Sequence, residues 1–300
     1  MKVLMYHKPV FLKESVDGLV WKSEGTYVDL TFGGGGHSAA ILDRLQGGRL
    51  YAFDQDQDAA ENAEGLALTF IQANFRHLKR YLKLYGVSEV DGILADLGVS
   101  SHQFDVPDRG FSTRFEADLD MRMDQQAQRT AKEVVNNYHE KELHQLLGMY
   151  GEVKNARTLA QAIVAARTNK TIETVEDLKQ VLNKFAPKGR EAKYYAQVFQ
   201  ALRLEVNDEI KALEEMLEQS VDLLAPGGRL VVISYHSLED RLVKNIINKG
   251  KLYGEVEKDF YGNPQLPLKA VNKKPLMPSQ EEIRENNRAR SAKLRIAEKR

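Results

Sequence analysis

Short apolar runs alternate with segments of helical period along the first hundred residues. Four runs are almost continuously apolar, at 26–30, 50–53, 67–71 and 92–95. Helices are expected between these runs, at 37–45, 59–63 and 75–85. Runs that are apolar at consecutive positions are typical of strands covered on both faces, as in a parallel sheet. Because crossovers between parallel strands are right-handed, this pattern predicts a doubly wound α/β domain.

The pattern changes after the fourth apolar run. Between 105 and 206 the chain has helix-period segments and no convincing strand; these segments are 131–138, 140–149, 155–167 and 175–185. One long helix is expected at 193–224, ending at a Pro-Gly-Gly turn at 226–228. A strand at 229–234, a helix at 237–247 and a strand at 291–297 follow. The sequence therefore predicts an α/β domain formed by 1–104 and 207–300, with an all-helical domain inserted at 105–206.

Composition narrows the class of protein. The 300 residues are 42% hydrophobic and 29% charged, which suits folded domains with a substantial core. No run approaches the roughly 18 apolar residues of a membrane helix, and the first ten residues lack a secretory apolar region. We therefore expect a cytoplasmic protein without a membrane partner. The absence of Cys excludes disulfides, thiolate zinc sites and a Cys nucleophile.

The zero net charge conceals a basic C-terminal segment. Residues 241–300 contain 15 Lys and Arg against 7 Asp and Glu, which gives +8 and leaves −8 for the rest of the chain. Such a segment suits a polyanionic partner, and it is equally typical of a solvated surface.

A glycine cluster follows the first expected strand. Gly33 to Gly36 separate that strand from a helix, which lets a ligand approach the backbone closely at the carboxyl end of the sheet. Gly34-x-Gly36-x-x-Ala39 is a loose match to the dinucleotide fingerprint.

Asp54 ends the second strand, where a carboxylate can accept hydrogen bonds from ribose hydroxyls. The alternative for Asp54 is a helix N-cap, a role for which Asp56 and Asp58 compete.

Two later strand ends also carry polar side chains. Asp96 ends the fourth strand, with Gly98 just beyond it, and the alternative for this segment is a helix cap. In the segment from Ser234 to Arg241, Ser237 and Asp240 resemble a capping box. Capping leaves His236 unexplained, so we assign it to the candidate site.

These motifs resemble the RsmH (MraW) family of bacterial methyltransferases, which transfer a methyl group from S-adenosylmethionine (SAM) to the N4 of a cytosine in small-subunit rRNA. The matching motifs span nearly the whole chain in family order: DLTFGGGGHS (29–38), FDQD (53–56), DGILADLGVSSHQ (91–103), RGFS (109–112), DLDMRMD (118–124), FQALRLEVNDE (199–209), LAPGGRLVVISYHSLEDR (224–241) and RARSAKLR (288–295). Three departures are present. At position 34, where this chain has Gly, many family members have another residue. At position 235, where this chain has Tyr, Phe is usual in the family. The segment 188–193 differs from the shorter basic stretch that is typical of the family.

The resemblance implies a class I, Rossmann-like methyltransferase sheet with SAM as the cofactor and no metal. It implies the 1402 position of 16S rRNA, within the small ribosomal subunit, as the target. The residues that it places at SAM are Gly35, Gly36, His37, Asp54, Phe75, Asp96 and Gln103. We add Gly33 of the same glycine cluster as a further candidate contact.

The chemistry fits an exocyclic amine. Methylation of cytosine C5 generally needs a thiolate adduct, and this chain has no Cys. We expect Asp96 to accept a hydrogen bond from N4, with His236 and Ser234 as further catalytic candidates. The base must leave any stack to reach the site.

The RNA contacts are expected from two regions. Arg203, near the end of the helical domain, and Asn207, just after it, are candidates to face the ligand cleft and bind RNA, the alternative being a solvated helix face. Arg288 and Arg290 are candidates for phosphate contacts, the alternative being a purely structural role at the last strand. A homodimer is compatible with the sequence. The rival functions are a nicotinamide-dependent oxidoreductase and a non-catalytic rRNA-binding assembly factor.

Overall fold

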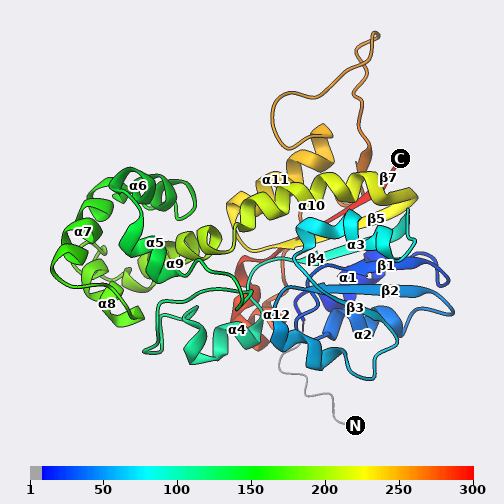
Figure 1. Ribbon diagram of the computed structural model, residues 1–300. Helices are drawn as coiled ribbons and strands as arrows, with labels where there is room; N and C mark the ends of the chain where they lie inside the picture. The colour runs from blue at the N-terminus through cyan, green and yellow to red at the C-terminus, as the bar shows by residue number, and fades with distance from the viewer. Residues whose placement is uncertain (1–8) are drawn as a thin grey trace. The chain divides into compact units, whose positions relative to one another are not determined.

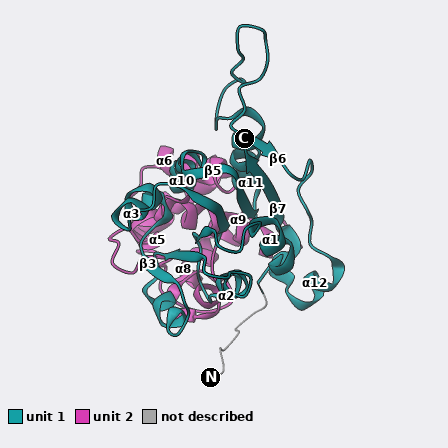
Figure 2. Ribbon diagram, turned by 90° about the vertical axis from the view of Figure 1, so that its right-hand side faces the viewer, with its two compact units in different colours: residues 1–98, 210–300 teal, residues 99–209 magenta. Residues whose placement is uncertain are grey.

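The computed structural model describes residues 9–300, which form two compact units. Unit 1 comprises the chain up to Gly98 and from Ile210 to Arg300, and unit 2 comprises Val99–Glu209 (Figure 2). The boundaries expected from the sequence were 105 and 206, so the difference concerns residues 99–104 and 207–209. The expectation about a secretory segment concerns mainly residues 1–8, which lie outside the described residues.

Unit 1 contains a seven-stranded sheet in the order β3-β2-β1-β4-β5-β7-β6. The strands are β1 Thr26–Asp29, β2 Arg49–Asp54, β3 Thr69–Gln72, β4 Val90–Asp96, β5 Leu224–Ser234, β6 Leu268–Ala270 and β7 Lys293–Lys299. The first five strands in the order are parallel to their neighbours, whereas β7 runs antiparallel to both β5 and β6. This order reverses between β1 and β4, as in Rossmann-like doubly wound sheets. The predicted fold class is confirmed.

Helices cover both faces of this sheet (Figure 1). The helices of unit 1 are α1 Leu12–Leu19, α2 Gly36–Leu42, α3 Leu78–Leu84, α10 Glu209–Leu223, α11 Ser237–Lys249 and α12 Gln280–Glu285. Neighbouring strand residues enter opposite layers: Ile93 packs in the cluster that includes α3, α10 and α11, and Leu94 packs in the one that includes α1 and α2. Because both faces are buried, every residue of β1 is buried, which explains the continuous apolar runs.

Unit 2 is helical and has its own core. Its helices are α4 Ser101–Asp105, α5 Ala131–Asn137, α6 Glu140–Met149, α7 Ala156–Asn169, α8 Val175–Leu182 and α9 Glu191–Val206. Among its described residues, the only β-structure is one isolated bridge, between Asp118 and Thr174. Within residues 9–300, no helix is long and apolar enough to cross a membrane.

The prediction of a single helix at 193–224 is wrong. The structure has two helices there, α9 and α10, which are separated at Asn207 and Asp208. Asp208 has a φ of 50°, a left-handed conformation that breaks the helix and that Asp tolerates better than most residues. The Asn207 side chain donates hydrogen bonds to the carbonyls of Arg203 and Met121, at 2.9 and 2.8 Å, and so stabilises the end of α9.

The Pro-Gly-Gly segment is not a turn outside the sheet, as the sequence suggested, but a bulge within β5. Val90 pairs with Leu224 and Gly92 pairs with Arg229, so the segment between them loops out of the ladder. Gly227 has a φ of 79°, which a residue with a side chain rarely adopts. Three short elements, α1, β6 and α12, were also missed.

Candidate active site

Three carboxyl groups stand at the carboxyl ends of three neighbouring strands. Asp54, Asp29 and Asp96 are the last residues of β2, β1 and β4, which are adjacent in the sheet. In doubly wound folds, ligands bind at this edge of the sheet, next to the point where the strand order reverses. This edge is therefore the candidate site of unit 1.

The glycine loop after β1 depends on three of its four glycines. Gly33 and Gly35 have φ values of 51° and 75°. A Cβ on Gly36 would lie 2.3 Å from Cγ of Pro9, whereas a Cβ on Gly34 would meet nothing within 4 Å. The Gly33 N–H donates to Asp54 Oδ2 at 2.8 Å, which fixes the loop to the end of β2. The loop is thus a shaped backbone cradle and not a flexible turn.

Asp54 is not the helix cap that the sequence left open as an alternative. Asp56 is the N-cap of the 3₁₀ helix Gln57–Ala63, and its side chain accepts from the Asp58 N–H at 3.1 Å. Asp54 accepts from the backbone N–H groups of Gly33 and Asp56, one on each carboxylate oxygen. Burial raises the pKa of Asp54 to about 6, and these hydrogen bonds oppose that rise. Each oxygen keeps a second lone pair for a ligand.

Asp29 is a buried carboxyl group that begins the glycine-loop motif and had no role predicted from the sequence. Its Oδ2 accepts from Ser38 Oγ at 2.7 Å, and its Oδ1 accepts from the Thr31 N–H at 3.1 Å. Burial raises the pKa of Asp29 to about 6. Its position at a strand end, identical to that of Asp54 and Asp96, was the signal that could have found it.

His37 is held in one orientation by the backbone before α1. Its Nε2 lies 3.1 Å from the Val10 carbonyl, which can only accept, so Nε2 carries the hydrogen. Burial lowers the pKa of His37 to about 4, so the ring is neutral at physiological pH. Its unprotonated Nδ1 lies 3.9 Å from Asp96 Oδ2.

Asp96 is held by contacts to two elements of unit 1. Its backbone N–H donates to Thr31 Oγ1 at 2.7 Å, and its Oδ1 accepts from the Tyr235 hydroxyl at 2.7 Å. Burial raises the pKa of Asp96 to about 7; the Tyr235 hydrogen bond opposes the rise, and the charges of Asp29 and Glu239 add to it. The side chain keeps 23% of its exposure, so a ligand can reach it.

His236 caps a helix, which the sequence did not predict. His236, not Ser237, is the N-cap of α11, and it forms a capping box with Glu239. Its Nδ1 accepts from the Glu239 N–H at 3.4 Å, and its Nε2 lies 2.9 Å from Glu239 Oε1. Capping therefore accounts for His236, and its catalytic role stays a prediction. Ser234 is buried, with its Oγ 3.5 Å from the Lys293 carbonyl oxygen, and its catalytic role is likewise untested.

Asp240 has a different role from the one expected. It accepts from Arg295 Nε at 2.7 Å and from Lys293 Nζ at 3.0 Å, which ties α11 to β7. Lys293 and Arg295 therefore form ion pairs within unit 1. Part of the positive charge of the C-terminal segment thus stabilises the fold.

The two remaining residues expected at SAM have local roles of their own. Phe75 begins the 3₁₀ helix Phe75–His77 after β3 and packs half-buried against the core. Gln103 belongs to unit 2, where it closes a capping box with Ser100 at the start of α4.

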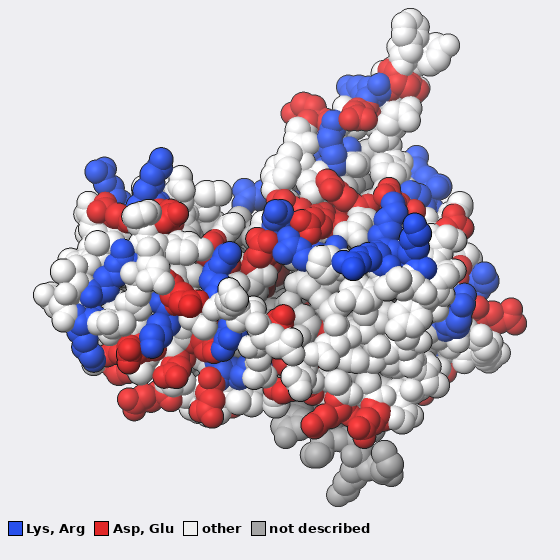
Figure 3. All heavy atoms as spheres, viewed as in Figure 1, with Lys and Arg blue, Asp and Glu red and all other residues white. Residues whose placement is uncertain are grey.

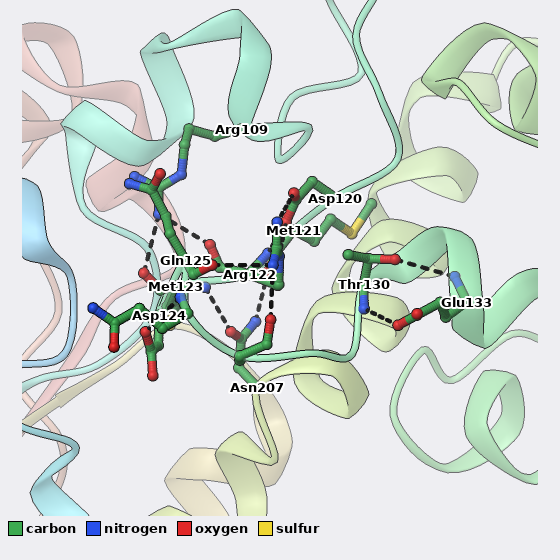
Figure 4. Close-up of polar contacts among 12 residues, drawn as sticks. Arg109, Asp120, Met121, Arg122, Met123, Asp124, Gln125, Thr130, Glu133 and Asn207 are labelled. Carbon is green, nitrogen blue, oxygen red and sulfur yellow. Dashed lines mark hydrogen bonds and ion pairs between the residues drawn. The ribbon is translucent and has the colours of Figure 1, made fainter.

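Arg203 and Asn207 both have partners within unit 2, and their contact with RNA stays a prediction. Arg203 makes two hydrogen bonds to Glu209, at 2.8 and 3.1 Å. The Asn207 side chain holds the backbone of Met121 and Met123, as Figure 4 shows.

The segment DLDMRMD is fixed by similar contacts. Arg109 donates to the carbonyls of Arg122 and Met123, and Arg122 pairs with Asp120 (Figure 4). Among residues 9–300, no group of three or more His, Asp and Glu side chains is arranged to hold a metal. Asp124 Oδ1 accepts from the Gln126 N–H at 2.9 Å.

The two C-terminal arginines lie in the 3₁₀ helix Asn287–Ser291, where Arg290 is exposed and Arg288 is partly buried. Another cationic surface was not anticipated. On the face drawn in Figure 3, Lys and Arg gather over α3, where Lys79, Arg80 and Lys83 are exposed. Lys79 pairs there with Asp222.

This combination of a glycine cradle and strand-end carboxylates recurs in several enzyme classes, and comparison with known proteins separates them. The model of the MraW methylase family matches residues 4–300. The chain belongs to this family. Three relatives named ribosomal RNA small subunit methyltransferase H are similar along their whole length. The protein of Cytophaga hutchinsonii is 60% identical, covering 98% of this chain and 100% of its own. Those of Flavobacterium johnsoniae and Christiangramia forsetii are both 57% identical, covering 98% and 100% of this chain and 98% and 100% of their own.

Proposed function

We propose that this methyltransferase transfers a methyl group from SAM to the exocyclic N4 of a cytidine in 16S rRNA, at the 1402 position that the family resemblance implies. The names of the relatives support the small-subunit rRNA as substrate. The observation that carries the proposal on the structural side is the open carboxyl group of Asp96, at a strand end next to the glycine cradle.

The residues present fit SAM. Gly33 and Gly35 have positive φ values, and the loop that they form presents backbone without side chains at the end of β1, which suits the close approach of the amino-acid part of SAM. Asp54 offers carboxylate lone pairs to ribose hydroxyls, and the half-buried ring of Phe75 offers an apolar face to adenine. When bound, SAM supplies an electrophilic methyl group on a sulfonium. Gln103 stays a candidate contact through the resemblance.

Asp96 is proposed to act on the amine. Its Oδ2 would accept a hydrogen bond from N4, which orients the amine and favours its lone pair over conjugation with the ring. A carbon–nitrogen bond forms as the carbon–sulfur bond breaks, and N4 then loses one proton. A carboxyl group with a pKa of about 7 is suited to accept that proton near neutral pH. His236 and Ser234 are retained as weaker candidates for the same role.

The remaining proposals concern how the protein binds rRNA. The cytosine must be extruded from any stack to reach the end of the sheet. We propose unit 2 as the part that recognises rRNA, with Arg203 and Asn207 as its candidate RNA contacts. Arg288 and Arg290 are proposed to contact phosphates of 16S rRNA within the small ribosomal subunit. The proposed location of the reaction is the cytoplasm. The proposal is compatible with a homodimer.

The test is methyl transfer from labelled SAM to small subunits purified from cells that lack the enzyme. We expect label in 16S rRNA with the wild-type protein and none with Asp96→Ala that remains folded. Binding of NAD but not SAM would favour an oxidoreductase. Binding of the subunit without any transfer of label would favour an assembly factor.

A further inference from the structure

Tyr235 connects the end of β5 to the candidate catalytic carboxyl group. Its hydroxyl donates to Asp96 Oδ1 at 2.7 Å, between residues 139 positions apart in the chain. The backbone of Tyr235 is fixed in turn, because its N–H donates to Oε2 of the buried Glu239 at 2.8 Å. Its ring lies beside Gly98, where an added Cβ would be 3.5 Å from Cδ2 of Tyr235.

This hydrogen bond makes the two oxygens of Asp96 unequal. Oδ1 is occupied by the Tyr235 hydroxyl. His37 Nδ1 lies 3.9 Å from Oδ2, which is beyond hydrogen-bond distance. No hydrogen bond to Oδ2 is found among residues 9–300, so this oxygen can accept from a donor outside the protein.

We infer that Tyr235 is a positioning residue for methyl transfer: its hydroxyl fixes the rotation of the Asp96 carboxyl group and keeps Oδ2 available to the amine of the substrate. The inference rests on the proposed function.

The electrostatic surroundings make the effect measurable. The ionisable groups that face Asp96 are Asp29 at the end of β1, His37 on α2, and Glu239 on α11, in addition to Tyr235 itself. Tyr235 also faces Glu282 of α12. Burial and these carboxylates raise the pKa of Tyr235 well above its usual value, so its hydroxyl remains a donor throughout the neutral range. Its hydrogen bond favours the ionised form of Asp96 and lowers the pKa of that carboxyl group.

The experiment compares Tyr235→Phe with wild type in single-turnover methyl transfer to small subunits between about pH 6 and pH 9. Removing the donor should raise the pKa of Asp96 by about one unit, the lower end of what a hydrogen bond to a charged group provides. If that pKa moves from about 7 to about 8, the ionised fraction at pH 7 falls roughly fivefold. The rate should therefore fall about fivefold at pH 7 and be nearly equal to wild type at pH 9, with SAM affinity unchanged.

The matched control is Tyr27→Phe, which deletes a buried hydroxyl of β1 that bonds to the Lys22 carbonyl. It should lower the melting temperature without moving the pH profile. A Tyr235→Phe loss of equal size at pH 7 and pH 9, or no loss at either, would overturn the inference. Absence of methyl transfer by the wild-type protein would instead refute the proposed function, so the two failures are distinguishable.

Discussion

Replacing Asp96 by Asn should make the protein without bound ligand more stable at about pH 8, although it removes the proposed proton acceptor. The carboxyl group has a pKa of about 7 in the folded protein, against a usual value of 3.8. The folded state therefore holds the proton more tightly than the unfolded state. Ionisation of Asp96 lowers the free energy of unfolding as the pH rises from about 4 to about 7. Asn has no such charge, and its Oδ1 can still accept from the Tyr235 hydroxyl.

The size of the effect follows from the shift in pKa. A shift of about three units corresponds to roughly 4 kcal/mol, at about 1.36 kcal/mol per unit. Because the Asp96 side chain keeps 23% exposure, solvent reduces this figure, and we expect about 1–3 kcal/mol. For a unit of this size, that is a rise in melting temperature of roughly 3–10 °C at pH 8.

The assay is thermal unfolding of the wild type and Asp96→Asn at about pH 8 and about pH 5, with Asp58→Asn as an exposed control. At pH 5 most of the Asp96 carboxyl groups are already protonated in the folded protein, so the advantage of Asn should shrink to less than half. The control should show no advantage at either pH. An Asp96→Asn protein that is less stable at pH 8, or whose advantage is the same at pH 5, would refute the account of this buried charge.

Three further predictions concern the cofactor and RNA contacts. Asp54→Ala should weaken SAM binding by about 1.5–3 kcal/mol, or roughly 10- to 100-fold, in calorimetric titration, because it removes the carboxylate hydrogen bonds; unchanged affinity would exclude Asp54 from the site. Gly36→Ala should impair SAM binding or folding, because its Cβ would lie 2.3 Å from another side chain, whereas Gly34→Ala should be tolerated; equal effects in the same titration and in thermal unfolding would contradict the loop geometry. Replacing Arg288 and Arg290 by Gln should flatten the log–log salt dependence of rRNA binding by about one to two units without changing SAM affinity; a loss of thermal stability with an unchanged slope would assign them a structural role.

The sequence predicted the sheet and much of the candidate site because both depend on local signals. Each strand of the parallel sheet is a short apolar run, and the polar residue that ends it, such as Asp54 or Asp96, lies at the same edge of the sheet as its neighbours. Glycines with positive φ values, such as Gly33 and Gly35, are also visible in the sequence as a local cluster.

The features that the sequence did not predict depend on contacts between distant residues. The break after α9 is supported by Asn207, whose side chain bonds to Met121 and Met123 more than eighty positions away. A helical spacing that continues through 207 and 208 gives no sign of these contacts. The role of His236 as a cap was missed because Ser237 is the more common capping residue and stands next to it.

The central claim is most directly tested by identifying the methylated nucleoside. Small subunits from cells lacking the enzyme are incubated with the protein and SAM, and their 16S rRNA is digested and analysed by mass spectrometry against nucleoside standards. The account predicts N4-methylcytidine with the wild type and none with folded Asp96→Asn. Formation of 5-methylcytidine, or full activity of the Asp96→Asn protein, would contradict it.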